Sequence, residues 1–323
     1  MVVFSRLMCR SLLTKSNITL QPLSRSVKQS ASAVGSGSGA GWMKATQVSS
    51  DLGKLAVLGT CATGLGALCV YGVLQPTSDS VLDQSVAYPA YVRERIRSTY
   101  LAFGSGLAMT AATAVTCARR PQKLMPLLSR MSTPMGAIGA MAVCFGSGIA
   151  VQVTPTPEKG HLGLKHAVWC MHSALLGGLI FPAIAIYGPL VGQAALYTGG
   201  ALAGLSAIAI TAPSEKFLVG GGMLGMGFAA LFAANIGTMF APSIAQPFMV
   251  NVITYGGVVL FSGFILHYTQ GLVHRAKAIP PDANMPGARP NFDPINNAIG
   301  LYTHTLNLFM HILRMLALNQ RKK

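Results

Sequence analysis

Long uncharged stretches of apolar residues alternate along the chain with short segments that carry charges or prolines. A helix needs about 20 predominantly apolar residues to cross the hydrocarbon core of a bilayer. Eight segments meet this requirement, at residues 55–74, 98–118, 131–153, 167–187, 190–212, 217–240, 248–270 and 294–316. The pattern therefore predicts an all-α membrane protein, built as a polytopic bundle of about eight transmembrane helices.

Two of the uncharged stretches are too long for a single span. No Lys, Arg, Asp or Glu occurs at positions 166–214 or 217–274. Glycine and proline commonly interrupt helices. We therefore expect a break at Gly188-Pro189 in the first stretch and another between Pro242 and Pro247 in the second.

Small residues recur at four-residue spacing in two neighbouring predicted spans. The pairs are Gly200 with Gly204 and Gly221 with Gly225. Such spacing favours close packing of helices in lipid, so we expect these glycines to lie at helix contacts.

The last predicted span, residues 294–316, is more polar than the others. Its polar side chains are Asn296, Asn297, His304, Asn307, His311 and Arg314. Because polar groups that face acyl chains are costly, we expect this helix to line the interior of the bundle.

The composition supports a membrane protein and argues against soluble domains. Only 10% of the residues are charged, 51% are hydrophobic and the mean hydropathy is +0.51, whereas soluble domains carry about 25% charged residues. The net charge is +16. The basic residues lie at the N-terminus, in short loops and at the last three positions, where cations flank a bilayer, so the expected partner is lipid and not nucleic acid.

The first 45 residues have the composition of a mitochondrial transit peptide and flexible leader. They contain six basic residues and no acid, because the first acidic residue is Asp51. A secretory signal would need an unbroken apolar stretch of about 7–15 residues, and Arg6, Arg10 and Lys15 interrupt each candidate. The leader predicts delivery to mitochondria; the alternative is a basic tail that is not processed.

The sequence offers no enzyme motif. It contains no GxSxG, HExxH, P-loop or Rossmann fingerprint, and its six cysteines form no CxxC pair of the kind that binds zinc. We therefore expect neither an enzyme nor a resident cofactor. Two classes of function remain open, which are an ion carrier and a membrane scaffold.

A few ionisable residues are candidates for an ion or proton pathway. Glu215 lies at a turn between two spans, where it is either a cation site or a solvated acid near a helix start. His267, His304 and His311 can titrate near neutral pH. His304 and His311 are seven residues apart with Asn307 between them, so the three share one helix face. That face either carries protons or forms hydrogen bonds to neighbouring helices.

Several ordered motifs resemble the Bax-inhibitor (transmembrane Bax-inhibitor motif) family, in its mitochondrial branch. They are Ala212-Pro213-Ser214-Glu215-Lys216-Phe217-Leu218, Tyr255-Gly256-Gly257 and Asp293-Pro294-Ile295-Asn296, with Tyr302 and Thr305-Leu306-Asn307 after them. The resemblance implies a seven-helix core at residues 98–316 with a central last helix, an extra N-terminal span at residues 55–74 and a basic tail at residues 317–323. It also implies an inner-membrane location, calcium/proton exchange with Ca²⁺ and H⁺ as transported ions, cristae organisation and protection from apoptosis.

The chain departs from the family at the two aspartates that the family places on its last two helices. Tyr268 and His304 stand at those positions, and Arg130 is the nearest match to the family's basic partner. One hypothesis is that Tyr268 and His304 form a proton-coupled pair that keeps transport. The alternative is a scaffold that regulates cristae structure and inner-membrane proteolysis through contacts with other inner-membrane proteins.

Overall fold

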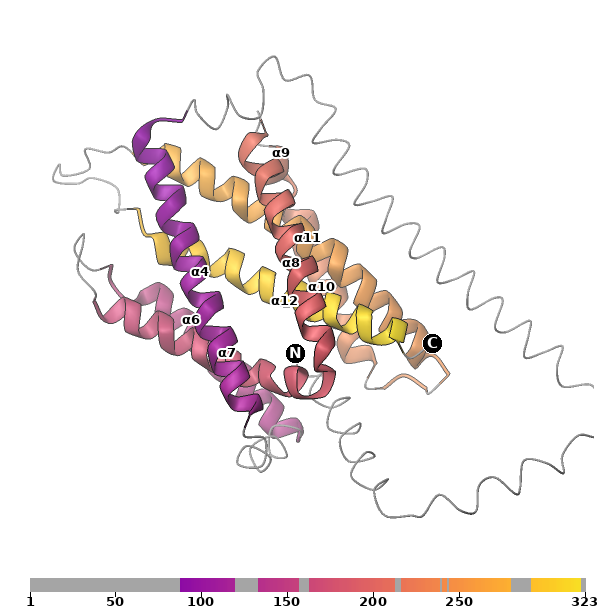
Figure 1. Ribbon diagram of the computed structural model, residues 1–323. Coiled ribbons are helices and arrows are strands. Elements are labelled where there is room, and N and C mark those ends of the chain that lie inside the picture. The colour runs from indigo at the N-terminus through magenta and orange to yellow at the C-terminus, as the bar shows by residue number, and fades with distance from the viewer. Residues whose placement is uncertain are drawn as a thin grey trace, which may run out of the picture.

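The computed structural model describes residues 88–119, 133–156, 163–212, 216–238, 240–242, 244–279 and 292–320. Every regular element in this part of the chain is an α-helix. In chain order these are α4 (Ala90–Ala118), α6 (Pro134–Val153), α7 (Leu164–Tyr187), α8 (Pro189–Thr211), α9 (Lys216–Val219), α10 (Gly221–Gly237), α11 (Gln246–Ala278) and α12 (Pro294–Gln320), as Figure 1 shows. The prediction of an all-α protein is confirmed.

Some predictions fall outside the described residues. These are the leader (residues 1–45), the extra span (residues 55–74), and the candidate residues Arg130 and Glu215. The basic tail expected at residues 317–323 begins inside α12, which continues to Gln320.

The helices identify a membrane protein, although only some of them have the dimensions of a full span. By length and composition, α4, α7, α8 and α11 can cross a bilayer, and the apolar helical segments Ile138–Val153 and Gly221–Gly237 are shorter. The total of eight spans therefore stays a prediction. The predicted break at Gly188-Pro189 is confirmed, because Gly188 ends α7 with φ of +45° and Pro189 begins α8.

Two helices extend well beyond their apolar stretches. α4 begins eight residues before position 98, and α11 ends eight residues after position 270. Hydropathy predicts where lipid lies, whereas a helix continues as long as its backbone hydrogen bonds form. The 29 residues of α4 span about 44 Å, so its charged first turns extend beyond a hydrocarbon core of about 30 Å.

The span predicted at residues 217–240 is interrupted and shorter than expected. A turn at Gly220 separates α9 from α10, and α10 ends at Gly237. Three consecutive glycines at positions 220–222 explain the interruption, since each glycine disfavours a helix by about 1 kcal/mol relative to alanine.

The expected role of the spaced glycines is wrong for three of the four. Among the described residues, a Cβ atom added at Gly200, Gly204 or Gly225 would meet no heavy atom within 4 Å, apart from each helix's own nearby backbone. These three glycines therefore contact no other helix in the part of the chain that the structure describes. Gly221, by contrast, faces the ring of His267.

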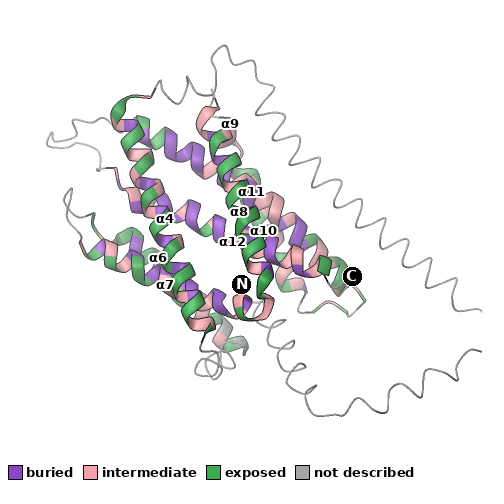
Figure 2. Ribbon diagram, viewed as in Figure 1, coloured by how far each residue is buried: buried purple, intermediate pink, exposed green. Residues whose placement is uncertain are grey.

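The last helix lies inside the bundle, as its polar side chains predict. α12 packs most extensively against α4, α8 and α11, and also contacts α6 and α7. Leu301, Tyr302, Leu308 and Leu313 are fully buried. Figure 2 shows buried residues concentrated along α11 and α12, whereas α10 contributes none among its described residues.

One end of the bundle gathers the starts of α4, α7 and α12 and the ends of α6, α8 and α11. Contacts between segments far apart in sequence place them there. The Tyr88 hydroxyl donates to the carbonyl of Ile210, and the Asn296 amide donates to the carbonyl of Gln152. We call this end of the bundle the Asp293 end, because Asp293 directly precedes α12 there and caps its first turn.

Candidate functional site

The structure brings together Tyr268 and His304, the two residues that the sequence resemblance predicts at the positions of the family aspartates. The rings of Tyr268 on α11 and His304 on α12 lie 4.7 Å apart between centroids. The ring of Phe264 stacks on His304 at 4.3 Å, with the two planes only 5° apart. Nδ1 of His304 is buried and has no hydrogen-bond partner in the described part of the chain. We call this group of rings, with His311 and Phe261, the α11–α12 ring cluster.

Two glycines make room for this cluster. A Cβ atom at Gly300 on α12 would collide with the ring of Tyr268, and one at Gly257 on α11 would collide with the ring of His311. Each ring therefore lies directly against the backbone of the opposite helix. The close approach of α11 and α12 depends on the absence of a side chain at these positions.

The other predicted site residues divide between the cluster and its edge. His311 contacts Phe261 with 5.3 Å between ring centroids. His267 lies edge-on to Tyr268 at 5.7 Å and donates from Nδ1 to the carbonyl of Phe217 at 2.9 Å. Of the two alternatives for the histidines, hydrogen bonding to a neighbouring helix thus holds for His267.

Asn307 does not join the two histidines of its helix. Its side-chain amide donates to the carbonyl of Thr303 at 2.9 Å, one turn earlier in α12. The polar face predicted from the seven-residue spacing is therefore interrupted between His304 and His311.

The chemistry of the ring cluster suits protons better than metal ions. Within the described ranges, no group of three His, Cys, Asp or Glu residues could hold a metal ion. Ca²⁺ prefers several oxygen ligands, usually including carboxylates, and the cluster consists of Phe, Tyr and His rings. An imidazole and a phenol can exchange protons.

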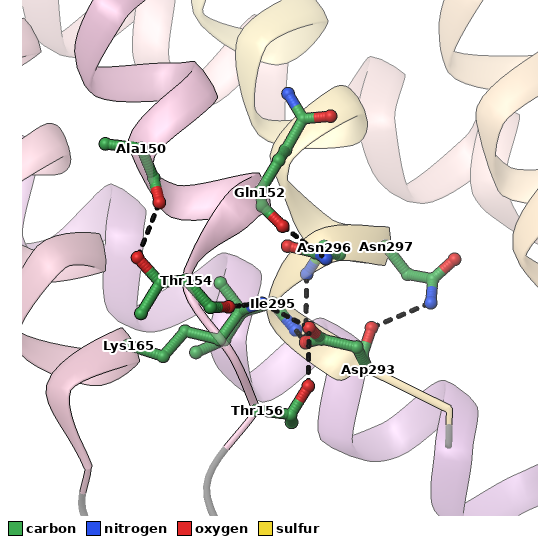
Figure 3. A network of polar contacts seen from close by, with 9 residues as sticks. All are labelled: Ala150, Gln152, Thr154, Thr156, Lys165, Asp293, Ile295, Asn296 and Asn297. Atoms are coloured by element: carbon green, nitrogen blue, oxygen red, sulfur yellow. Dashed lines mark hydrogen bonds and ion pairs between the residues drawn. The ribbon is translucent and has the colours of Figure 1, made fainter. Parts of the chain in front are cut away.

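Sequence reasoning missed a second polar site, a buried ion pair at the Asp293 end. Lys165, in the first turn of α7, forms an ion pair with Asp293 at the start of α12 (Figure 3). Only 1% of the Lys165 side chain and 10% of the Asp293 side chain is exposed. The Lys165 ammonium also donates to the carbonyl of Thr154 at 2.9 Å, just after α6. The pair therefore joins three helices.

Asp293 also caps α12. Its Oδ1 accepts the backbone N–H groups of Ile295 and Asn296 at 3.0 and 3.1 Å, which satisfies two donors that a helix start leaves free. Its Oδ2 accepts from the Thr156 hydroxyl at 3.1 Å and faces Lys165. One carboxylate thus caps the first turn of the central helix and forms an ion pair with the Lys165 ammonium.

Two sequence signals point to this pair. An aspartate followed by proline is typical of a helix start, because Pro294 suits the first helical position. Lys165 is the last charged residue before the uncharged stretch that begins at position 166. Neither signal shows that the two residues meet, because 128 positions separate 165 from 293.

A third polar group lies deeper, where α12 meets α4, α6 and α7. The hydroxyls of Thr110 and Tyr302 are 2.6 Å apart. Ser147 Oγ is 2.9 Å from Nδ1 of His172, while Nε2 of His172 is buried with no hydrogen-bond partner among the described residues. The ring of Trp169 lies 5.0 Å from that of Tyr302. These contacts fix the orientation of α12 in the bundle.

At the Asp293 end, cationic and aromatic side chains connect the start of α4 to the ends of α8 and α11. Arg95 of α4 donates at 2.8 Å to the carbonyl of Ala276 and also to that of Ile279, where α11 ends. The Tyr88 hydroxyl donates to the carbonyl of Ile210 at 2.7 Å. Burial raises the pKa of Tyr88 above its usual value, so this donor stays protonated.

The fold and the site define a polytopic membrane protein whose most polar helix is central. Residues 92–321 match the family described as "Inhibitor of apoptosis-promoting Bax1", and the chain belongs to this family. It is 39% identical over 275 residues to the growth hormone-inducible transmembrane protein of Rattus norvegicus, an alignment that covers 84% of this chain and 77% of that protein. The family resemblance drawn from the motifs is confirmed.

More distant relatives carry the family name. Bax inhibitor 1 of Oryza sativa subsp. japonica is 27% identical over 197 residues, which covers 60% of this chain and 70% of that protein. Bax inhibitor 1 of Drosophila melanogaster is 24% identical over 239 residues, which covers 73% of this chain and 87% of that protein. The names of both relatives agree with the family match over residues 92–321.

Proposed function

We propose that this chain is a multi-pass protein of the mitochondrial inner membrane that exchanges Ca²⁺ for protons and has no enzymatic activity. Like the family it belongs to, it would also support cristae organisation and restrain apoptosis. The acid-free basic leader supports the location. The family match and the similarity to the growth hormone-inducible transmembrane protein support the class of function.

The contact between Tyr268 and His304 carries the proposal of proton coupling. The two rings lie 4.7 Å apart on adjacent helices, at the positions where the family has its aspartates. The imidazole of His304 can bind and release a proton, and the hydroxyl of Tyr268 can donate or accept a hydrogen bond. The pair can therefore pass a proton, although it supplies no carboxylate for Ca²⁺.

Flux measurements on reconstituted protein test this function. The full chain in vesicles should move Ca²⁺ with a pH dependence that His304→Ala abolishes. His274→Ala is the matched control, because His274 is exposed near the end of α11 and should leave the flux unchanged. Unchanged flux in the His304→Ala variant would dismiss the role of this residue, and absence of flux in the parent protein would dismiss the exchange itself.

A non-transporting scaffold is a second candidate, favoured by the packing of the same site. Phe264 stacks flat on His304, and the described residues supply no carboxylate there. A scaffold would act through contacts with other inner-membrane proteins on cristae structure or on proteolysis. It predicts no Ca²⁺ flux and altered cristae on deletion, and normal cristae would contradict it.

Restoring both acids separates the two candidates. If the chain has lost transport, the double variant Tyr268→Asp/His304→Asp should gain Ca²⁺ flux that the parent lacks. If the chain is an exchanger, the parent already shows flux. Import into isolated mitochondria followed by mass measurement of the mature N-terminus tests the location.

A further inference from the structure

Arg275 of α11 lies at the outer end of the α11–α12 ring cluster. The residue is exposed, and its Nε donates to Oδ1 of Asn297 on α12 at 2.6 Å. A Cβ atom at Gly271, one turn earlier in α11, would lie 3.5 and 3.7 Å from Nη1 and Nη2 of the arginine. The guanidinium therefore folds back along its own helix, in the direction of the cluster.

The next side chain on this face of α11 is Tyr268. Positions 268, 271 and 275 share a face, because spacings of three and four residues return to the same side of a helix. Gly271 has no side chain that could separate Tyr268 from Arg275. The Arg275 guanidinium thus lies within electrostatic range of the Tyr268 hydroxyl.

One face of α12 contacts the same two residues. Asn297, Gly300 and His304 lie on that face, at spacings of three and four residues. Asn297 binds Arg275, and Gly300 lies against the Tyr268 ring. His304 lies 4.7 Å from that ring between centroids, and its Nδ1 is buried. Arg275, Tyr268 and His304 therefore form a line from the exposed end of the bundle to a buried imidazole.

The contact with Asn297 orients Arg275 without neutralising its charge. Nδ2 of Asn297 donates to the carbonyl of Asp293 at 2.7 Å, so Oδ1 is the atom that remains for the guanidinium. An amide oxygen accepts a hydrogen bond but carries no net charge. In the described part of the chain no carboxylate pairs with Arg275. Its positive charge is therefore available to Tyr268.

We propose, on the basis of the proton coupling proposed above, that Arg275 is the positioning residue of the Tyr268–His304 pair. It supplies the counter-charge that Tyr268 needs when its hydroxyl passes a proton to His304. In this step the O–H bond of Tyr268 breaks and an N–H bond forms on the imidazole of His304. The products are a tyrosinate and an imidazolium, and the net charge of the pair does not change.

The proton transfer needs help because the phenol is the weaker acid. In water the phenol of tyrosine loses its proton at about pH 10, and an imidazolium does so at about pH 6.5. A nearby positive charge favours the anionic form of a group, and an arginine stays charged throughout this range. The ring of Phe264 stacks on His304 at 4.3 Å, and an aromatic face attracts a cation. Each charged product thus has a partner in the cluster.

Few other charged or titratable groups face Tyr268 from the helices packed against it. From α11 itself His267 lies edge-on at 5.7 Å. From α4 Arg95 bonds to the carbonyls of Ala276 and Ile279, where α11 ends. The helix α9 begins with Lys216, and α8 and α10 carry no Asp, Glu, Lys, Arg or His. No carboxylate of the described residues contacts the cluster.

Lys277 provides a matched control two residues away. It is also an exposed cation near the end of α11, but its ammonium lies over the ring of Tyr88, 4.4 Å from the centroid. Two residues correspond to a rotation of about 200° around a helix. Lys277 therefore tests the effect of surface charge in general, and Arg275 tests the effect of a charge beside Tyr268.

The ionisation of Tyr268 in the full chain tests the role of Arg275 without a flux measurement. Protein with isotope-labelled tyrosine is titrated in detergent micelles to alkaline pH, and Tyr268→Phe identifies the NMR signal. Arg275→Gln should raise the midpoint of Tyr268 by about one pH unit, the low end of the range for a close opposite charge. Arg275→Lys should raise it less, because the charge is kept. Asn297→Ala should also raise it less than Arg275→Gln, because the guanidinium is no longer held, and Lys277→Gln should leave it unchanged.

Three results would overturn the role of Arg275. They are an unchanged midpoint in Arg275→Gln, equal shifts in Arg275→Gln and Lys277→Gln, and a shift in Arg275→Lys as large as that in Arg275→Gln. The last result would show that Arg275 acts through its shape and not through its charge. Because Arg275 is exposed, its variants should fold, and Asn297→Ala tests the same contact from the other helix.

Calcium flux in vesicles separates this role from the function proposed above. A shifted midpoint in Arg275→Gln, together with no Ca²⁺ flux in the parent protein, would dismiss the exchange and leave the charge effect of Arg275 on Tyr268. Flux in the parent with an unchanged midpoint in Arg275→Gln would dismiss the role of Arg275 and leave the exchange.

Discussion

Removing the charge of Lys165 while keeping its shape should destabilise the bundle strongly. Methionine has a similar length, so Lys165→Met leaves packing nearly intact and strands the Asp293 carboxylate in a buried position. Breaking a buried ion pair by removing one partner costs about 3–5 kcal/mol. The burial of both side chains and the hydrogen bond from Lys165 to Thr154 place this pair in that class.

The matched partner variant is Asp293→Asn. Asparagine caps helices as well as aspartate does, so its side-chain oxygen should still accept from the N–H groups of Ile295 and Asn296. This variant therefore removes the charge and preserves the helix start. It should cost about as much as Lys165→Met, because it leaves a buried ammonium unpaired.

The double variant provides the decisive comparison. Lys165→Met/Asp293→Asn removes both charges. Its loss of unfolding free energy should therefore be about 1–3 kcal/mol smaller than the losses of the two single variants added together. Thermal unfolding in detergent measures these differences, and each single variant should lower Tm by roughly 6–20 °C. The exposed control Lys277→Met should stay within about 0.5 kcal/mol of the parent. Single losses that simply add would refute the inference that the two charges compensate each other.

Three further outcomes follow from packing and composition. Gly300→Ala should displace the Tyr268 ring and lower stability by about 1–3 kcal/mol. The control Gly222→Ala should not lower stability, because a Cβ atom there meets no described neighbour. Equal thermal shifts for the two variants would contradict the close approach of α11 and α12. Tyr302→Phe should cost about 0.5–1.5 kcal/mol in thermal unfolding through loss of the hydrogen bond to Thr110, and an unchanged Tm would argue against that bond. The full chain should remain in the membrane pellet after carbonate extraction, and recovery in the soluble fraction would contradict the membrane class.

The sequence predicts the helices well because their apolar stretches are long and uncharged. The prediction fails where hydropathy and helix formation diverge. α4 and α11 continue past their apolar stretches, and the glycines at positions 220–222 divide a uniformly apolar segment. The backbone preference of a few residues decides where a helix begins and ends. Hydropathy averaged over about 20 residues does not resolve these positions.

The candidate site is predictable only in part, because short sequence patterns do not show which residues of different helices contact each other. The family motifs identify Tyr268 and His304, and the structure places them in contact. Four-residue glycine spacing, by contrast, points to Gly200 and Gly204, which face open space, whereas Gly300 lies against a ring and belongs to no such pair. A glycine at a helix contact is recognised by the ring opposite it, and that ring comes from another part of the chain.

The polar groups of this bundle are arranged around one helix for a physical reason. α12 contacts five other helices, so its side chains have partners in several directions, and polar groups in lipid are stable only when such partners exist. On one side Tyr302 bonds to Thr110 of α4, and on another His304 stacks with α11. At the start of the helix Asp293 binds Lys165. A shift of α12 would therefore disturb all three groups together. Breaking the Lys165–Asp293 pair with Lys165→Met should thus alter the environment of His304, which is detectable as a change in its imidazole NMR signals. Unchanged His304 signals in this variant would show that the two ends of α12 act independently.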